Sequence, residues 1–62
     1  SAEESVIRVP PGSTLADAER ILIRETLAAQ GGNKSRTAEI LGIGRKTLYQ
    51  KIQDYKLEPG HE

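Results

Sequence analysis

The chain has 62 residues, of which 35% are hydrophobic and none is cysteine, and its formal net charge is zero. A chain this short holds one small domain at most, its core leaves a monomer only marginally stable, and it has neither a disulfide nor a thiolate metal site. It also lacks an apolar run of the ~20 residues that a membrane span needs, and its start lacks a signal-peptide pattern, so we expect a cytoplasmic protein without a membrane partner.

The charges are distributed unevenly along the chain. Residues 33–56 carry six lysines and arginines against two acidic residues, a net charge of +4, whereas residues 1–32 carry a net charge of −2. A basic segment of this kind suits a surface that faces phosphate groups. Taken alone, the pattern favours the simpler interpretation that the charges solvate the helices.

Residues 1–13 are predicted to form a linker with at most a short extended piece. Val6–Val9 has β-prone side chains, and the Pro10–Gly12 run that follows ends any strand. We therefore divide the chain into this flexible segment, a folded domain over residues 14–57 and a flexible tail over residues 58–62. The single histidine, His61, lies in that tail and has no expected role.

The first helix is predicted over residues 15–30. Ser13 or Thr14 can cap it, since a hydroxyl accepts a hydrogen bond from an N–H group that has no partner inside the helix. Asp17 in the first turn interacts favourably with the helix dipole. The pair Gly31–Gly32 ends the helix, because glycine adopts the left-handed conformation at little cost.

The apolar residues of this helix fall on two arcs at about 100° per residue. The broad arc contains Leu15, Ala18, Ile21, Leu22, Ala28 and Ala29. The second arc contains Ala16, Ile23 and Leu27. A helix with two apolar faces must bury both, and a chain this short offers little to cover the second. We expect Ile23 and Leu27 to pack on the domain core, and a homodimer interface formed by Leu15, Ala18, Ile21, Leu22 and Ala29. The alternative is a helix sandwiched within one chain.

A helix, a tight turn and another helix are predicted next. Asn33 is a good N-cap for a helix over residues 34–41, in which Ala38 and Leu41 face inward. The Gly42–Gly44 turn allows a positive φ at its first glycine and places Ile43 between the helices. In the helix that follows, over residues 45–55, a buried stripe is formed by Leu48, Ile52 and Tyr55, with Leu57 folding back after its end. This is the layout of a helix-turn-helix DNA-binding unit.

The exposed face of the last helix carries the candidate DNA contacts. Its members are Arg45, Lys46, Thr47, Tyr49, Gln50, Lys51 and Gln53. Arginine can bind guanine O6 and N7 as a fork, glutamine can pair with adenine, and lysine and threonine bind phosphates. The start of the preceding helix can bind another phosphate, beside Asn33, Ser35 and Arg36.

Several of these residues also have purely structural alternatives. Asn33 would then only cap its helix, and Tyr49 would pack on the edge of the domain. Lys51 and Gln53 would be merely solvated. Arg45 is the strongest individual candidate, because it opens the helix that enters the groove.

Enzymatic function finds no support in the residues. The chain has no Ser/His/Asp or Cys/His set, no metal-ligand spacing and no Gly-x-x-x-x-Gly-Lys phosphate loop. We therefore predict no catalytic residue, no metal, no cofactor and no small-molecule substrate.

Residues 15–57 resemble the Fis-type helix-turn-helix that closes NtrC-family enhancer-binding proteins, the bacterial response-regulator activators of sigma-54 RNA polymerase. The resemblance rests on the segments 15–20, 32–43 and 46–52, together with Ile23 and Leu27; Pro10–Ser13 is similar to the linker before that domain. It implies a homodimer through the first helix that binds paired half-sites upstream of a promoter. The receiver and ATPase domains of that family are not within these 62 residues, so this chain would supply only the DNA address and dimerisation.

The resemblance also implies individual roles. By similarity to Fis, Asn33, Ser35, Arg36 and Thr47 match phosphate-contacting positions, and Gly44, Arg45 and Gln50 match base-reading positions. Two residues depart from the family pattern. Gly44 replaces the usual serine or asparagine, which removes a side-chain cap, and Gln50 stands where Fis has lysine, which leaves the base preference open.

We thus predict an all-α, three-helix, homodimeric domain that binds double-stranded DNA sequence-specifically at inverted half-sites. The DNA-binding residues are Asn33, Ser35, Arg36, Gly44, Arg45, Lys46, Thr47, Tyr49, Gln50 and Lys51. Two alternatives stay open at this point. One is a Fis-like nucleoid protein that bends DNA with loose specificity, and the other is a dimerisation or protein-interaction module.

Overall fold

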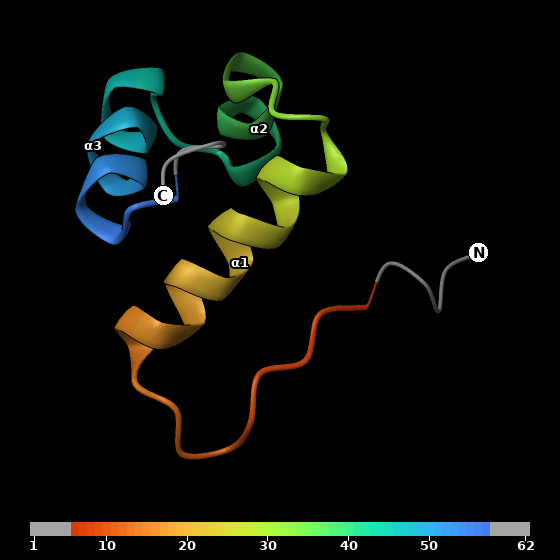
Figure 1. Ribbon diagram of the computed structural model, residues 1–62, viewed down its shortest axis with the longest axis vertical. Helices are drawn as coiled ribbons and strands as arrows, with labels where there is room; N and C mark the ends of the chain where they lie inside the picture. The colour runs from red at the N-terminus through yellow and green to blue at the C-terminus, as the bar shows by residue number, and fades with distance from the viewer. Residues whose placement is uncertain (1–5, 58–62) are drawn as a thin grey trace.

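The computed structural model describes residues 6–57, so the predicted tail, His61 and the first five residues of the predicted linker lie outside the described part. Within residues 6–57 three helices follow one another: α1 (Leu15–Ala29), α2 (Lys34–Leu41) and α3 (Arg45–Tyr55). Figure 1 shows the long α1 crossing the molecule, with the shorter α2 and α3 gathered toward its C-terminal half. Residues 6–57 contain no strand, which confirms the predicted all-helical class for this range.

The entry into α1 is set by a turn and a cap. The N–H group of Ser13 donates to the Pro10 carbonyl at 3.1 Å, and Gly12 has a φ of 91°. Proline and a positive-φ glycine at these positions are typical of a type II turn. Thr14 then caps α1, since its Oγ1 accepts from the Asp17 N–H at 3.0 Å. The β-prone Val6–Val9 segment before the turn has no regular secondary structure.

All three helices end in the same way. A residue in the left-handed conformation follows each helix: Gly31, Gly42 or Lys56. The N–H group of the residue after it donates back to a carbonyl five residues earlier, as in a Schellman motif. The three bonds join Gly32 to Leu27 at 2.9 Å, Ile43 to Ala38 at 3.1 Å and Leu57 to Ile52 at 2.9 Å. In α1 these bonds end the helix at Ala29, one residue before the predicted end, with Gln30 as its C-cap.

The helix-turn-helix follows the predicted boundaries at both helices. Asn33 caps α2, because its Oδ1 accepts from the Arg36 N–H at 3.0 Å. The turn begins at Gly42, which has a φ of 74°. Gly44 is the N-cap residue of α3 and provides no side-chain hydrogen bond, as its lack of a side chain requires.

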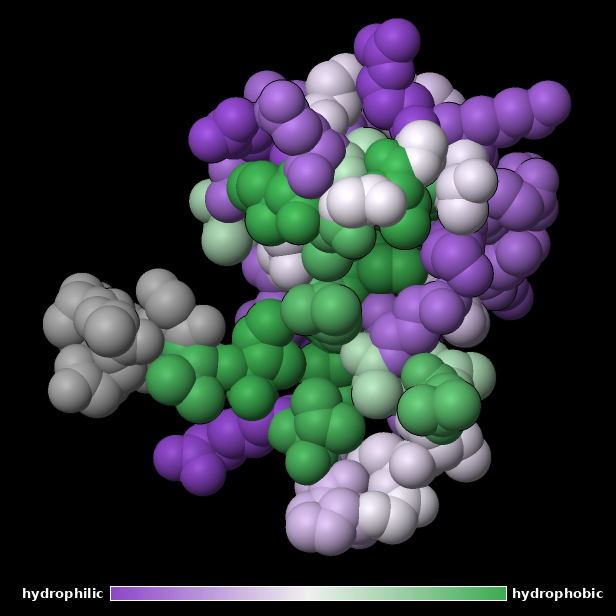
Figure 2. All heavy atoms as spheres, turned by 180° about the vertical axis from the view of Figure 1, so that it is seen from behind, coloured by the Kyte–Doolittle hydropathy of each residue, from purple (hydrophilic) through white to green (hydrophobic). Residues whose placement is uncertain are grey.

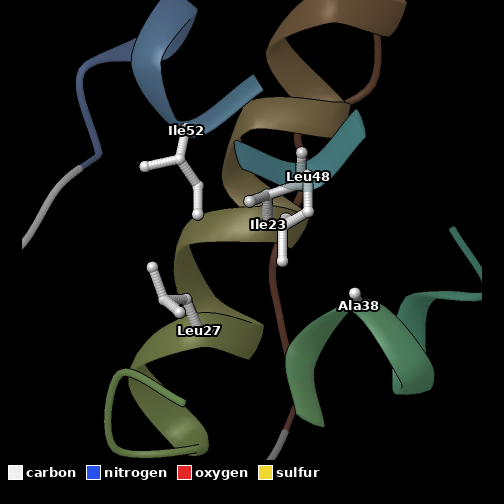
Figure 3. Packing of buried hydrophobic residues seen from close by; sticks show 5 residues of the cluster. All are labelled: Ile23, Leu27, Ala38, Leu48 and Ile52. Carbon is white, nitrogen blue, oxygen red and sulfur yellow. The ribbon is translucent and has the colours of Figure 1, made fainter. Parts of the chain in front are cut away.

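The core lies where the three helices meet. It consists of Ile23 and Leu27 from α1, Ala38 from α2, and Leu48 and Ile52 from α3 (Figure 3). The side chains that the Schellman motifs carry, Ile43 and Leu57, pack against this cluster, as do Leu41 and Tyr55. The predicted inner arc of α1 and the predicted stripe of α3 are therefore confirmed at their central residues. Ala16 is exposed, because it lies two turns before the core on α1.

One polar side chain, Thr37, is fully buried beside this core. Its Oγ1 donates to the carbonyl of the N-cap residue Asn33 at 2.7 Å, so the buried hydroxyl has a hydrogen-bond partner. The N-cap residue and the buried threonine thus fix the start of α2 together.

Candidate nucleic-acid interface

The outer face of α3 lies opposite its buried stripe. Leu48 and Ile52 are 0% and 1% exposed, and this anchors the rotation of the helix about its axis. The residues turned outward are exposed: Arg45, Lys46, Thr47, Tyr49 and Gln50. We call this set the α3 outer face. It presents two cations, a hydroxyl, a phenol and an amide on little more than one and a half turns of helix.

Two contacts order side chains on the α3 outer face. The Nε2 of Gln50 donates to Asp54 Oδ1 at 3.0 Å, one turn further along α3. The ring of Tyr49 lies under the ammonium group of Lys34, with 5.9 Å between Nζ and the ring centroid. The second contact joins the start of α2 to the first turn of α3 through a cation–π interaction. Both pairs are accessible to solvent. A ligand can therefore take the place of Asp54 beside Gln50, or of Lys34 above the ring of Tyr49.

A shallow hollow of about 310 Å³ runs along one side of α3. It is lined by Lys46, Thr47, Gln50, Lys51 and Asp54. Every lining side chain is polar, and one of them is acidic.

The start of α2 adds a second polar group to the same side of the helix-turn-helix. Asn33 is engaged by the cap, and Ser35 is exposed. The Arg36 guanidinium lies 3.1 Å from Glu39 Oε1 on the surface, where its side chain is 59% exposed. Exposed ion pairs of this kind contribute little free energy and exchange readily. Arg36 can therefore leave Glu39 for a phosphate at little cost.

Lys51 has a different environment from the other predicted contacts. Its Nζ donates to Glu19 Oε2 on α1 at 2.7 Å, and Tyr55 Oη donates to the same oxygen at 2.9 Å. We call these three residues the α1–α3 clamp. Neither Glu19 nor the role of the Tyr55 hydroxyl was predicted from the sequence. No local signal could have revealed them, because 32 and 36 positions separate the partners.

The clamp shifts the pKa of each of its members. Hydrogen bonds from Lys51 and Tyr55 lower the pKa of Glu19, because they stabilise the carboxylate. The bond to Glu19 raises the pKa of Lys51, and it also raises the pKa of the Tyr55 hydroxyl. The three shifts have the same meaning: the folded protein favours a charged Glu19, a charged Lys51 and a neutral Tyr55.

The outer surface of α1 carries the predicted dimerisation residues. Leu15 is 90% exposed and Leu22 is 45% exposed, although both are large apolar side chains. Ala29 is exposed as well, and Ala18 and Ile21 are half-buried. Figure 2 shows hydrophobic side chains gathered across the middle of one side of the molecule, with hydrophilic ones above them.

Apolar side chains outside α1 extend this surface. Val6 and Val9 are 67% and 41% exposed, and Ile40 on α2 is 49% exposed. An open hollow of about 420 Å³ connects Val6 and Ile40 to α1; it is lined by Val6, Ile7, Glu25, Thr26, Ala29, Gln30 and Ile40. These apolar residues were not predicted as part of the surface, because Val6–Val9 was expected to be linker and the periodicity of α1 concerns that helix alone.

The described residues contain neither a membrane-spanning helix nor a metal-binding cluster. No helix there is both long and apolar enough to cross a membrane. Residues 6–57 also contain no cluster of three or more His, Cys, Asp or Glu side chains that could hold a metal ion.

Comparison with known proteins identifies a family and several relatives. Residues 14–55 match the sequence model of the family described as "Bacterial regulatory protein, Fis family". Regulatory protein AtoC of Escherichia coli strain K12 is 46% identical over 41 residues, which are 66% of this chain and 9% of AtoC. UacR of the same strain, whose name describes a sigma-54-dependent transcriptional regulator, is 44% identical over 46 residues, 74% of this chain and 8% of UacR.

A third relative has a name that specifies DNA binding. The DNA-binding transcriptional regulator NtrC of Azospirillum brasilense is 41% identical over 44 residues, which are 71% of this chain and 9% of that protein. The chain thus spans about a tenth of the length of the curated relatives it matches. No solved structure matches it significantly.

Proposed function

The chain belongs to the Fis family of bacterial regulatory proteins, and we propose that it is the DNA-binding domain of a sigma-54-dependent transcriptional activator of the response-regulator type. In this proposal it binds double-stranded DNA sequence-specifically as a homodimer, with one α3 in each of two major grooves. In this proposal the DNA-binding unit is residues 14–57.

The observation that carries the proposal is the α3 outer face. The buried stripe of Leu48 and Ile52 turns five polar side chains outward at the start of the second helix of a helix-turn-helix. That position is the one from which such a helix reaches base edges. We assign base reading to Arg45 and Gln50, since their side chains can form paired hydrogen bonds to guanine and adenine.

Phosphate contacts are assigned to the residues around this face. They are Asn33, Ser35, Arg36, Lys46 and Thr47, with Tyr49 at the edge of the groove. Gly44 lets the backbone approach the DNA without a side chain between them. It has open space around the position that a Cβ would occupy, so the missing side chain reflects no packing constraint inside the domain.

The homodimer is proposed on the exposed apolar surface of α1. Water contact at Leu15 and Leu22 is unfavourable, and a second copy would remove it by the hydrophobic effect. The pairing residues in this proposal are Leu15, Ala18, Ile21, Leu22 and Ala29. Two-fold pairing of α1 would set the distance between the two α3 helices, which bind half-sites about 34 Å apart if they lie one helical turn apart on the DNA.

Selection of bound sequences from a random duplex pool, at two salt concentrations, tests the proposal. We expect an enriched inverted repeat whose spacing reports the dimer geometry. Enrichment of loosely related, bendable sequences would favour the nucleoid protein instead. Binding that shows no sequence preference and disappears as salt rises would mean phosphate attraction only, and the protein-interaction module would replace our proposal.

A further inference from the structure

The contact between α1 and α3 has an apolar part and a polar part. Ile23 and Leu27 of α1 share the core with Leu48 and Ile52 of α3, so the two helices meet through their side chains. The polar part is the α1–α3 clamp, in which a single carboxylate oxygen of Glu19 accepts from both Lys51 and Tyr55.

The spacing of the clamp residues places the polar contact in line with the apolar one. Glu19 lies four residues before Ile23, one turn earlier on the same side of α1. Lys51 and Tyr55 are also four residues apart, on one side of the buried Leu48 and Ile52 of α3. The clamp therefore extends the helix contact by one turn beyond the core.

The two parts of this contact constrain the helices differently. Apolar burial is non-directional and permits small rotations of one helix on another. Hydrogen bonds are directional, and those made by an ionised group are short and strong. Two such bonds to one oxygen, from successive turns of α3, restrict both the rotation and the tilt of α3 relative to α1.

We propose that Glu19 is a positioning residue for DNA recognition, which sets the orientation of the α3 outer face relative to α1 by holding Lys51 and Tyr55. The inference rests on the proposed function, since it concerns the register of two recognition helices in a dimer joined through α1. It assigns Lys51 to the joint between helices instead of to the phosphate contacts predicted from the sequence. The Lys51 side chain is 33% exposed and that of Glu19 is 38% exposed, so the joint lies at the surface, beside the DNA-binding face.

Three roles for Glu19 predict different changes in DNA affinity. A positioning residue affects binding to the correct site, where geometry matters, and has little effect on non-specific attraction. A purely stabilising residue changes both affinities by the same factor, through the fraction of folded protein. A carboxylate that only repels phosphate weakens both, so removing it strengthens both.

The test uses Glu19→Gln and Tyr55→Phe, with Asp17→Asn as the matched control. Asp17 carries the same charge on the same helix, and its carboxylate lies 3.9 Å from Arg20 within α1. Affinities are measured by titration of two labelled duplexes, the site selected from the random pool and a scrambled version. Circular dichroism at the same temperature establishes the folded fraction of each variant.

For Glu19→Gln we expect affinity for the selected site to fall about 3- to 10-fold, the effect of losing charge-assisted hydrogen bonds, while affinity for the scrambled duplex stays level or rises slightly. Tyr55→Phe, which changes no charge, should lower only the selected-site affinity, by about 2- to 5-fold. Asp17→Asn should lower neither. Equal losses on both duplexes, or gains on both, would overturn the proposal. If the wild type selects no site at all, the proposed function fails first and this inference fails with it.

The salt dependence of binding checks the assignment of Lys51 separately. Lys46→Gln should reduce the slope of log affinity against log salt by about 0.9, because it removes one phosphate contact. Lys51→Gln should leave that slope unchanged while lowering selected-site affinity. A reduction of the slope by Lys51→Gln equal to that by Lys46→Gln would make Lys51 a phosphate ligand and contradict its place in the clamp.

Discussion

The outer surfaces of α1 and α3 are both exposed, but their chemistry is opposite. The α3 outer face consists of polar side chains that water solvates well, such as Arg45, Lys46 and Gln50. The outer surface of α1 leaves Leu15 at 90% exposure and Leu22 at 45%. Water solvates the first surface well. The free energy of the second surface is lowered when another apolar surface covers it.

In the proposed function this difference corresponds to separate tasks, DNA binding for α3 and pairing of two copies for α1. A surface that binds DNA must stay soluble between encounters and must discriminate by hydrogen bonds. A surface that pairs two copies works by removing apolar area from water.

The largest effect is expected from Leu22→Asp. A carboxylate in the centre of the apolar α1 surface would be desolvated on pairing, so the dimer should dissociate. Affinity for a two-half-site duplex should fall about 100-fold or more, because each half-site is then bound independently. Sedimentation velocity and duplex titration measure the two effects.

The matched control for this variant is Ala16→Asp. It adds the same charge to an exposed position of α1, on the other arc of the helix. It should leave both the sedimentation coefficient and the affinity close to those of the wild type. If Leu22→Asp sediments like the wild type, the pairing surface lies elsewhere.

A smaller effect is expected in the turn before α3. Gly42 has a φ of 74° and open space around it, so Gly42→Ala meets no clash and loses about 1–2 kcal/mol of folding free energy to the left-handed conformation alone. Gly44 has a φ of −71° and is also uncrowded, so Gly44→Ser adds a helix cap and should gain about 0.5 kcal/mol. Urea unfolding measures both, and changes of the same sign would refute this account of the turn.

The smallest effect is a pH dependence that belongs to the clamp. The pKa of Glu19 is lowered on folding from its ordinary value of 4.5, so its contribution to stability is complete above pH 4.5 and is lost as pH falls through the lowered value. The unfolding free energies of the wild type and Glu19→Gln should therefore differ at pH 7 and converge in acid. A difference that stays constant down to pH 3 would show that Glu19 stabilises the fold by packing alone.

The helix boundaries could be predicted closely because residues next to each boundary determine it. Asn33, Gly42 and Gly44 mark the starts and ends of α2 and α3, and the observed bounds equal the predicted ones. α1 ends one residue early because its final carbonyls are satisfied by N–H groups of the Gly31–Gly32 pair and Gln30, which already leave the helix. Caps and end motifs depend on neighbouring residues only, so sequence reasoning can find them.

Neither the α1–α3 clamp nor the addition of Val6 and Ile40 to the apolar α1 surface could be predicted, because both depend on how segments distant in sequence pack together. Periodicity places Lys51 on the border of the buried stripe, where solvation, phosphate contact and a helix joint are all consistent with the sequence. Only the packed structure brings Glu19 within 2.7 Å of it. In the same way, tertiary packing places Ile40 and Val6 beside the α1 surface, around one hollow.

The most direct test of the central claim is to repeat the random-pool selection with Arg45→Ala. We predict that the variant still enriches an inverted repeat with unchanged spacing, but loses its preference at one base position in each half-site, where the wild type should gain roughly 1–3 kcal/mol of discrimination. An unchanged sequence preference with uniformly weaker binding would mean that Arg45 contacts phosphate only, and that the α3 outer face does not read bases as proposed.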